Sequence, residues 1–248
     1  MPIDFSHFNL IKLDATPSTN TLLKEMLQKK MVQGPTVVWA KHQTQGRGQG
    51  ARSWISAPNK NLTLSVYSPL EGVAAADAFL LSAGVAVTIA YLLTTFGVAA
   101  VELKWPNDIL SGSKKIAGLL FENIITGTQL SGVLIGIGVN INQTEFLGLP
   151  KATSVALSTG KTIDVEGFGA QLLTQIAQLL KHPMPWPTAE WLTDYNQLLY
   201  GRHQQVTLNT PDTAFTALLK EVNATGAFVI ENAGKTFSYA PQKIRIQY

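Results

Sequence analysis

The stretch that decides the fold is residues 115–141, which read KIAGLLFENIITGTQLSGVLIGIGVNI. Its two apolar runs, Lys115–Ile125 and Leu130–Ile141, flank a short segment typical of a tight turn, so they predict an antiparallel pair of strands. Gly136 and Gly138 alternate in the second run and therefore lie on one face of the strand. They indicate either a smooth floor for a flat ligand or close packing between a strand and a helix.

The residues before this hairpin predict two helices and three strands. One helix is expected at Asn20–Met31, where apolar residues fall on one face, and a longer one at Asp77–Phe96. Short apolar runs predict strands at Thr36–Lys41, Leu62–Tyr67 and Val101–Trp105. The alternation of apolar and polar residues in Leu62–Tyr67 is that of a half-buried strand.

The residues after the hairpin change in character at Gly201. Before it, helices are expected at Val165–Leu180 and Ala189–Leu199, separated by a proline-rich segment. After it, short strands with polar turns are typical of a small β-barrel of the SH3 kind. These strands are Gln204–Leu208, Thr213–Val222, Ala227–Glu231 and Thr236–Tyr239. We predict an α+β fold with a larger domain at residues 1–199 and an SH3-like β-barrel at residues 200–248.

The composition of the chain excludes several classes of site. Apolar residues make up 46% and charged residues 14% of the 248, which is enough for a buried core. The sequence contains no cysteine, so disulfides, cysteine metal sites and cysteine nucleophiles are excluded. The four histidines are scattered without metal-ligand spacing. A net charge of +3 gives little support to nucleic-acid binding.

The N-terminus lacks the basic start and apolar core of a signal peptide. The most apolar stretch, Ala74–Ala100, contains Asp77 and several hydroxyl residues, which favours a buried helix over a membrane span. We therefore expect a soluble, cytoplasmic protein without a membrane partner.

The segment Gly46–Trp54 is rich in glycine and carries Arg47 and Arg52. Its glycines permit unusual backbone dihedrals and close approach to a ligand, and its guanidinium groups suit carboxylate or phosphate oxygens. A solvated flexible turn is an equally good interpretation of this segment alone. It is not a Walker A loop, because no Gly-Lys-Ser/Thr follows at the required spacing.

Three shorter motifs have both a functional and an ordinary interpretation. The segment Lys104–Asp108 follows an apolar strand and suits the wall of a cleft, although its last residues are also common turn formers. Lys115, ahead of Gly118, places an ammonium either in a cavity or in solvent at the mouth of a strand. The residues Ser18–Asn20 offer hydroxyls and an amide to a neutral polar ring, and helix capping explains them equally well.

The order of these motifs resembles that of the biotin protein ligases, also called biotin–[acetyl-CoA-carboxylase] ligases. Ser-Thr-Asn is followed by Gln-x-x-Gly-Arg-Gly…Arg-x-Trp, Lys-Trp-Pro-Asn-Asp, Lys-Ile-Ala-Gly and Gly-x-Gly-x-Asn, from about Ser18 to Asn142. The β-rich tail from Gly201 looks like the C-terminal domain of that family. The resemblance implies a class II synthetase-like fold, with a mixed or antiparallel sheet and flanking helices.

The resemblance also implies a two-step reaction that uses ATP, Mg²⁺ and biotin. Biotin's carboxylate attacks the α-phosphate of ATP, and the biotinyl-5′-AMP so formed is attacked by a specific lysine. That lysine belongs to the biotin carboxyl carrier protein, with acetyl-CoA carboxylase as the expected owner. Cations must neutralise the charge of the carboxylate and the triphosphate during the first step.

Matching positions assign expected roles to individual residues. Arg47 and Lys115 are expected to be catalytic, in contact with the carboxylate and the α-phosphate, and Asp108 is expected to assist the metal or the incoming lysine. The residues expected to bind biotin are Ser18, Thr19, Asn20, Gln43, Arg47, Gly48, Gln49, Lys115, Gly118, Gly136 and Gly138. Those expected to bind the nucleotide are Arg47, Arg52, Trp54, Trp105, Asn107, Lys115 and Asn140.

The sequence departs from the family pattern in two places. Gln49 stands where the family usually has a second arginine, and Ala51 stands where it has a glycine. We expect the ligand loop to close less firmly, so that some adenylate escapes. The first motif begins already at Ser18, which leaves no room ahead of it for the helix-turn-helix domain of some members. We therefore expect a ligase without repressor activity or specific DNA binding.

Two other functions stay open at this point. A lipoate ligase would share the expected fold and adenylating chemistry, and a non-catalytic module would hold biotin or a carrier domain without reacting. The intact Arg47, Lys115 and Asp108 argue against the second. The sequence does not distinguish a monomer from a homodimer. Contact with ATP or the partner and simple exposure to solvent both stay open for Arg202 and Lys243.

Overall fold

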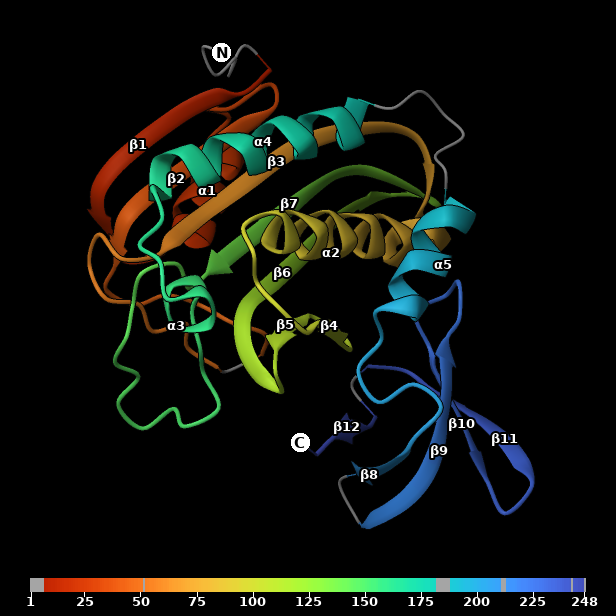
Figure 1. The fold of residues 1–248 in the computed structure, drawn as a ribbon. Helices are drawn as coiled ribbons and strands as arrows, with labels where there is room; N and C mark the ends of the chain where they lie inside the picture. The colour runs from red at the N-terminus through yellow and green to blue at the C-terminus, as the bar shows by residue number, and fades with distance from the viewer. Residues whose placement is uncertain (1–6, 51, 182–187, 211–212, 242, 248) are drawn as a thin grey trace.

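Seven strands form a mixed sheet in the order β1-β2-β3-β7-β6-β5-β4 (Figure 1). The computed structural model describes residues 7–50, 52–181, 188–210, 213–241 and 243–247. The strands are β1 (Asn9–Thr16), β2 (Thr36–Gln43), β3 (Leu62–Ala74), β4 (Val101–Lys104), β5 (Asp108–Ser111), β6 (Lys114–Thr126) and β7 (Gln129–Val139). Among the named strands of this sheet, β1 and β2 are the one parallel pair in the described residues, because helix α1 (Thr19–Gln28) connects them.

The predicted β6–β7 hairpin is confirmed, and Gly127, at φ +62°, lies in its turn. The strand predicted at Leu62–Tyr67 is present, but it is longer than predicted and is not half-buried. Strand β3 continues to Ala74, and Leu62–Val66 are buried on both faces rather than on alternate ones. The reason is that β3 lies inside the sheet and helices cover both of its faces, so its polar side chains are buried too.

Helices lie on both faces of the larger sheet (Figure 1). On one face, α1 packs on β2, β3 and β7 around a cluster that contains Leu23, Val38 and Leu134. On the other face, α2 (Ala78–Thr95) and α4 (Val165–Lys181) lie over the main core. The short 3-10 helix η1 (Ala75–Asp77) precedes α2, and the short α3 (Val155–Thr159) precedes α4. The segment Ala75–Thr95 is apolar and long enough to cross a membrane by length and composition, but 61% of it is buried inside the protein.

The second sheet is antiparallel, in the order β11-β10-β9-β8-β12. Its strands are β8 (Gln205–Asn209), β9 (Ala214–Val222), β10 (Phe228–Asn232), β11 (Lys235–Tyr239) and β12 (Arg245–Ile246). The β-rich C-terminal segment predicted from the sequence is therefore confirmed as a second sheet, but the pairings among the described residues end at β11 and β12 and do not close a barrel. The prolines predicted to separate α4 from α5 (Thr188–Gln197), which are Pro183, Pro185 and Pro187, lie outside the described residues.

Buried polar contacts join the second sheet to the first domain. Asn196, on α5, accepts a hydrogen bond from Val222 N at 2.8 Å and donates one to Val222 O at 2.9 Å. Arg202 donates to the carbonyls of Asn196 and Lys220 at 3.1 and 3.2 Å. The side chain of Arg202 thus fastens this junction.

Candidate functional site

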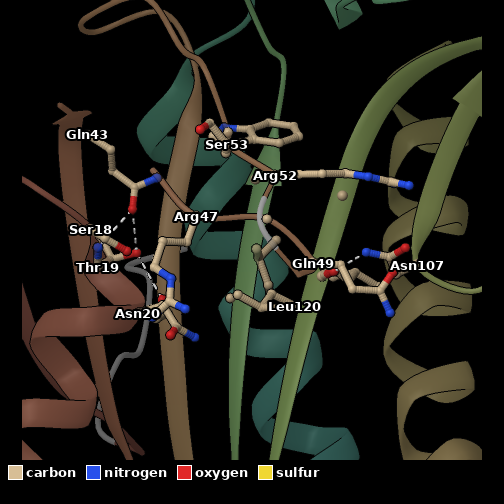
Figure 2. A pocket seen from close by; sticks show the side chains of 18 of the residues that line it. Ser18, Thr19, Asn20, Gln43, Arg47, Gln49, Arg52, Ser53, Asn107 and Leu120 are labelled. Carbon is tan, nitrogen blue, oxygen red and sulfur yellow. Dashed lines mark hydrogen bonds between the residues drawn. The ribbon is translucent and has the colours of Figure 1, made fainter. Parts of the chain in front are cut away.

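The candidate site is a cavity between the N-terminus of α1, the segment Gly46–Trp54, and the ends of β5, β6 and β7 (Figure 2). The structure brings most of the predicted site residues together here. The cavity is lined by Ser18, Thr19, Asn20, Gln43, Arg47, Gly48, Gln49, Arg52, Ser53, Trp54, Leu64, Ser65, Asn107, Asp108, Lys115, Gly118, Leu119, Leu120, Gly136, Ile137 and Gly138. Of the predicted residues, Trp105 and Asn140 do not line it.

One end of the cavity holds neutral polar groups. The backbone N–H and the hydroxyl of Thr19 both donate to Gln43 Oε1, at 2.8 and 3.0 Å (Figure 2). Ser65 Oγ lies 2.9 Å from Thr19 Oγ1, and it is the donor in this pair because the single hydroxyl hydrogen of Thr19 is directed at Gln43. Since Gln43 Oε1 accepts twice, the amide nitrogen of Gln43 is left as a donor for a ligand.

Asn20 completes this neutral end. Its side chain is 3% exposed, and neither Nδ2 nor Oδ1 has a hydrogen-bond partner within the described part of the chain. Such a buried amide costs free energy until a ligand or water satisfies it. Ser18 is the N-cap of α1 and accepts from Thr21 N at 3.4 Å, so the capping interpretation of this motif is confirmed for Ser18.

The segment Gly46–Trp54 folds over the cavity as a narrow loop whose two sides are bonded to each other. Gly48 N donates to Arg52 O at 2.8 Å, and Trp54 N donates to Gly46 O at 2.8 Å. Figure 2 shows Arg47 reaching toward Thr19 and Asn20, while Arg52 extends to the opposite side. The two guanidinium groups thus serve different parts of the cavity. Gln49 lines the cavity and is exposed, whereas Ala51 lies outside the described residues.

Of the two glycines of the predicted floor, Gly138 lies directly under the ring of Trp54, whereas Gly136 faces Leu120 and Asn20. A Cβ added to Gly138 would lie 2.4 Å from Trp54 Cε2, and one added to Gly118 would lie 3.2 Å from Trp54 Cζ3. Only glycine therefore permits this stacking. Lys115 Nζ lies 5.5 Å from the centroid of the same ring.

The other end of the cavity holds charged groups. Lys115 Nζ lies 2.6 Å from Asp108 Oδ1, and Lys104 Nζ lies 3.8 Å from Asp108 Oδ2. The Asp108 side chain is only 8% exposed, so its charge is stabilised mainly by these two ammonium groups. Burial lowers the pKa of Lys104; the charge of Asp108 opposes this shift, and the charges of Lys115 and Arg52 add to it.

Strand pairing fixes the position of Asp108. It is the first residue of β5 and pairs with Gly118 of β6. The expected turn is present at residues 105–107, directly before it. Asn107 Nδ2 donates to Leu119 O at 2.8 Å, and Leu119 N donates to Asn107 O at 2.9 Å. The side chain of Asn107 thus holds the wall of the cavity in place.

Trp105 lies elsewhere than predicted. Its ring is 1% exposed, packs against Phe228 with centroids 4.8 Å apart, and donates from Nε1 to Gly226 O at 3.0 Å. The expected packing of its ring on an adenylate does not fit this burial, because the second sheet already covers the ring. Asn140 lines a neighbouring apolar cavity with Phe146 and Leu149, and its Nδ2 donates to Thr153 O at 2.9 Å.

Two polar side chains that contact predicted site residues, Ser65 and Lys104, were missed by the sequence interpretation. Ser65 lies within a run read only as strand, and its contact with Thr19 depends on the position of α1 over β3. Lys104 belongs to a quoted motif but received no role. Two features of the sequence could have indicated its role. The residues of β4 alternate between apolar and polar, and Asp108 follows Lys104 by four residues.

The comparisons with known proteins agree with this geometry. The model of the biotin/lipoate A/B protein ligase family matches residues 13–140, which is more than half of the chain. The chain belongs to this family. The match includes every residue of the cavity described above, from Ser18 to Gly138.

Several curated members of this family are similar to the chain. The bifunctional ligase/repressor BirA of Salmonella typhimurium is 28% identical over 229 residues, which are 91% of this chain and 70% of that protein. The biotin–[acetyl-CoA-carboxylase] ligase of Paracoccus denitrificans is 34% identical over 140 residues, which are 54% of this chain but only 58% of that protein.

A solved structure has the same fold. The biotin protein ligase of Aquifex aeolicus, in complex with biotin and ATP, is 24% identical and superposes with a TM-score of 0.81. The superposition covers 96% of this chain and 98% of that one. The predicted α+β ligase fold is thereby confirmed.

Proposed function

We propose that this protein is an ATP-dependent biotin protein ligase that acts on a lysine of a biotin carboxyl carrier domain. The observation that carries the proposal is the division of the cavity: the uncharged hydrogen-bonding groups of Thr19, Gln43 and Asn20 lie at one end, where Arg47 reaches toward them, and the ion pair of Lys115 with Asp108 lies at the other. Relatives named as biotin ligases, and a structural neighbour that holds biotin and ATP, support it. We further propose that residues 1–199 form the catalytic domain and residues 200–248 an accessory one.

Biotin's ureido ring suits the neutral end. The ring offers a carbonyl acceptor and two N–H donors, and the cavity offers the amide nitrogen of Gln43 and both polar ends of the Asn20 amide. Lipoate has a dithiolane ring that forms no comparable hydrogen bonds, so it would leave Asn20 buried and unsatisfied. This difference favours biotin over lipoate as the substrate.

The adenylating step needs charge neutralisation rather than a base. A carboxylate oxygen of biotin attacks the α-phosphorus of ATP, the bond to the β-phosphate oxygen breaks, and pyrophosphate leaves. Arg47 and Lys115 would hold the carboxylate and the phosphoryl oxygens together, with Arg52 toward the nucleotide. The apolar cavity beside Trp54, with Asn140 at its edge, would take the adenine.

The transfer step uses the acceptor amine. Its nitrogen attacks the acyl carbon of biotinyl-AMP, a C–N bond forms, the acyl C–O bond breaks, and AMP leaves with the bonding pair. The two protons that the acceptor ammonium loses pass to water. Asp108 would accept a hydrogen bond from the amine and so orient it.

Mg²⁺ would enter with the triphosphate rather than occupy a site made by the protein. Within the described residues there is no group of three or more His, Asp or Glu side chains that could hold a metal ion. Asp108 alone is a poor ligand set, because both of its oxygens already face ammonium groups. Mg²⁺ commonly binds through substrate phosphates with few protein carboxylates. When bound, it would neutralise charge on those phosphates.

The proposal is tested by transfer of radiolabelled biotin or lipoate to purified carrier domains. With ATP and Mg²⁺ we expect biotin to label the biotin carboxyl carrier domain, and lipoate to label neither a biotin nor a lipoyl carrier domain. Labelling of a lipoyl domain by lipoate alone would make the protein a lipoate ligase, and labelling of neither would support a binding module. The absence of specific DNA binding stays a prediction. The oligomeric state, monomer or homodimer, stays open.

A further inference from the structure

Asp108 lies on the wall between two cavities. It lines the main cavity with Lys115, and it also lines a second cavity at the junction with the small β domain. This second cavity contains Arg52, Lys104 and Arg245, so its charged residues are mostly basic. The carboxylate of Asp108 is thus within reach of groups that enter from either side.

The two ammonium groups that face Asp108 differ in their exposure. The Lys115 side chain is 30% exposed, lines the main cavity and lies over Trp54. The Lys104 side chain is 11% exposed. A phosphoryl group that enters the main cavity competes with Asp108 for Lys115, because both are anions. Lys104 is shielded from that competition by its burial.

A buried carboxylate that loses one of its counter-ions becomes costly unless another remains. We propose that Lys104 is the resident counter-ion of Asp108, a positioning residue that keeps this carboxylate ionised and oriented when the adenylate draws Lys115 away. Lys104 thereby serves the transfer step and not adenylate formation. The role of Lys104 in the transfer step rests on the proposed function. The pairing of Lys104 with Asp108 does not depend on that function.

The charged and titratable groups around Lys104 come from several elements. Asp108 on β5, Lys115 on β6, Arg52 in the loop and Arg245 on β12 surround it or share its cavity. Beneath them lies Tyr195 of α5, which is fully buried and whose pKa is raised by burial and by the charge of Asp108. Asp108 favours the protonated form of Lys104, whereas Lys115 and Arg52 disfavour it.

The activity test separates the two half-reactions. In Lys104→Met we expect the rate of adenylate formation, measured by pyrophosphate exchange, to stay within about threefold of the wild type. The single-turnover rate of transfer from biotinyl-AMP to a carrier domain should fall about tenfold or more. Lys104→Arg should restore most of the transfer rate, because it keeps the charge. The exposed Lys114→Met is the matched control and should change neither rate. Equal losses in both half-reactions, or no rescue by arginine, would overturn the proposal.

The pairing is tested by NMR titration of the labelled Lys104 side chain in the whole protein. We expect Lys104 to be protonated at neutral pH, to titrate at lower pH in Asp108→Asn and to titrate at higher pH in Lys115→Met. A Lys104 titration that Asp108→Asn leaves unchanged would overturn the pairing. If Lys104→Met does not fold, Lys104→Gln replaces it in the activity test. A wild-type protein that makes no adenylate would instead contradict the proposed function, and the titration would still decide the pairing.

Discussion

The two ends of the cavity are built in different ways. At the neutral end, Thr19, Gln43 and Ser65 already bond to one another, while the amide of Asn20 and the amide nitrogen of Gln43 are left for a ligand. At the charged end, Asp108 is paired with Lys115 and Lys104, so a ligand must exchange one ion pair for another. The neutral end is thus already arranged without a ligand, whereas we expect the charged end to rearrange on binding. We expect mutations at the first to change affinity and mutations at the second to change rate.

The largest effect is expected at the charged end. Lys115→Ala removes the ammonium that would stabilise the phosphoryl oxygens, and we expect the rate of adenylate formation to fall by about 100-fold or more. The loss of biotin affinity, from the missing contact with the carboxylate, should be smaller than this loss of rate. The measurement is pyrophosphate exchange beside calorimetric titration with biotin. The neighbouring Lys114→Ala is the control. A Lys115→Ala enzyme that loses affinity but keeps its rate would reverse the comparison.

The neutral end is tested by Thr19→Val, which keeps the shape but removes the hydroxyl between Gln43 and Ser65. We expect the dissociation constant of biotin to rise about three- to tenfold, with the rate at saturating biotin nearly unchanged. Thr174→Val on α4 removes a hydroxyl far from the cavity, where it donates to Ala170 O, and should leave affinity alone. A lower maximal rate without a change in affinity would argue against a preformed neutral end.

The loop over both ends carries the Gln49 substitution predicted to weaken closure. Because Gln49 is exposed, an arginine there adds only a partly screened charge. We expect Gln49→Arg to slow the release of biotinyl-AMP by up to about fivefold. Stopped-flow dilution of the enzyme–adenylate complex measures the release. An unchanged or faster release would mean that position 49 does not hold the adenylate.

The smallest effect concerns Glu102, which is two residues before Lys104 on β4 and is half-buried. Burial raises the pKa of Glu102, so the folded state binds its proton more tightly than the unfolded state does. Its contribution is therefore favourable at acidic pH and is lost as pH rises through the raised value. Glu102→Gln should raise the melting temperature slightly at neutral pH, and this gain should vanish at about pH 4.

Much of the neutral end follows from the sequence. The Ser18–Asn20 motif and the alternate glycines of β7 lie where short-range patterns put them, because helix starts and strand faces are local properties. The hairpin Lys115–Ile141 was predictable for the same reason. Ser65 was not, because its role depends on the packing of α1 over β3. Gln43 was predicted only from the family resemblance.

The charged end depends more on tertiary structure. Trp105 was predicted to touch the nucleotide, but the small β domain covers its ring through Gly226 and Phe228, and no local pattern indicates that docking. Lys104 is an ordinary strand residue in sequence, and its burial beside Asp108 arises only when β4 and β5 pair. Pairing across strands is therefore what the sequence interpretation could not supply.

The central claim is that the neutral end selects biotin and the charged end joins it to AMP. ATP–pyrophosphate exchange in the wild-type protein tests this most directly, because it needs no carrier protein. We predict exchange that requires biotin and that lipoate does not support. Exchange that is absent with biotin, or equally fast without it, would contradict the account.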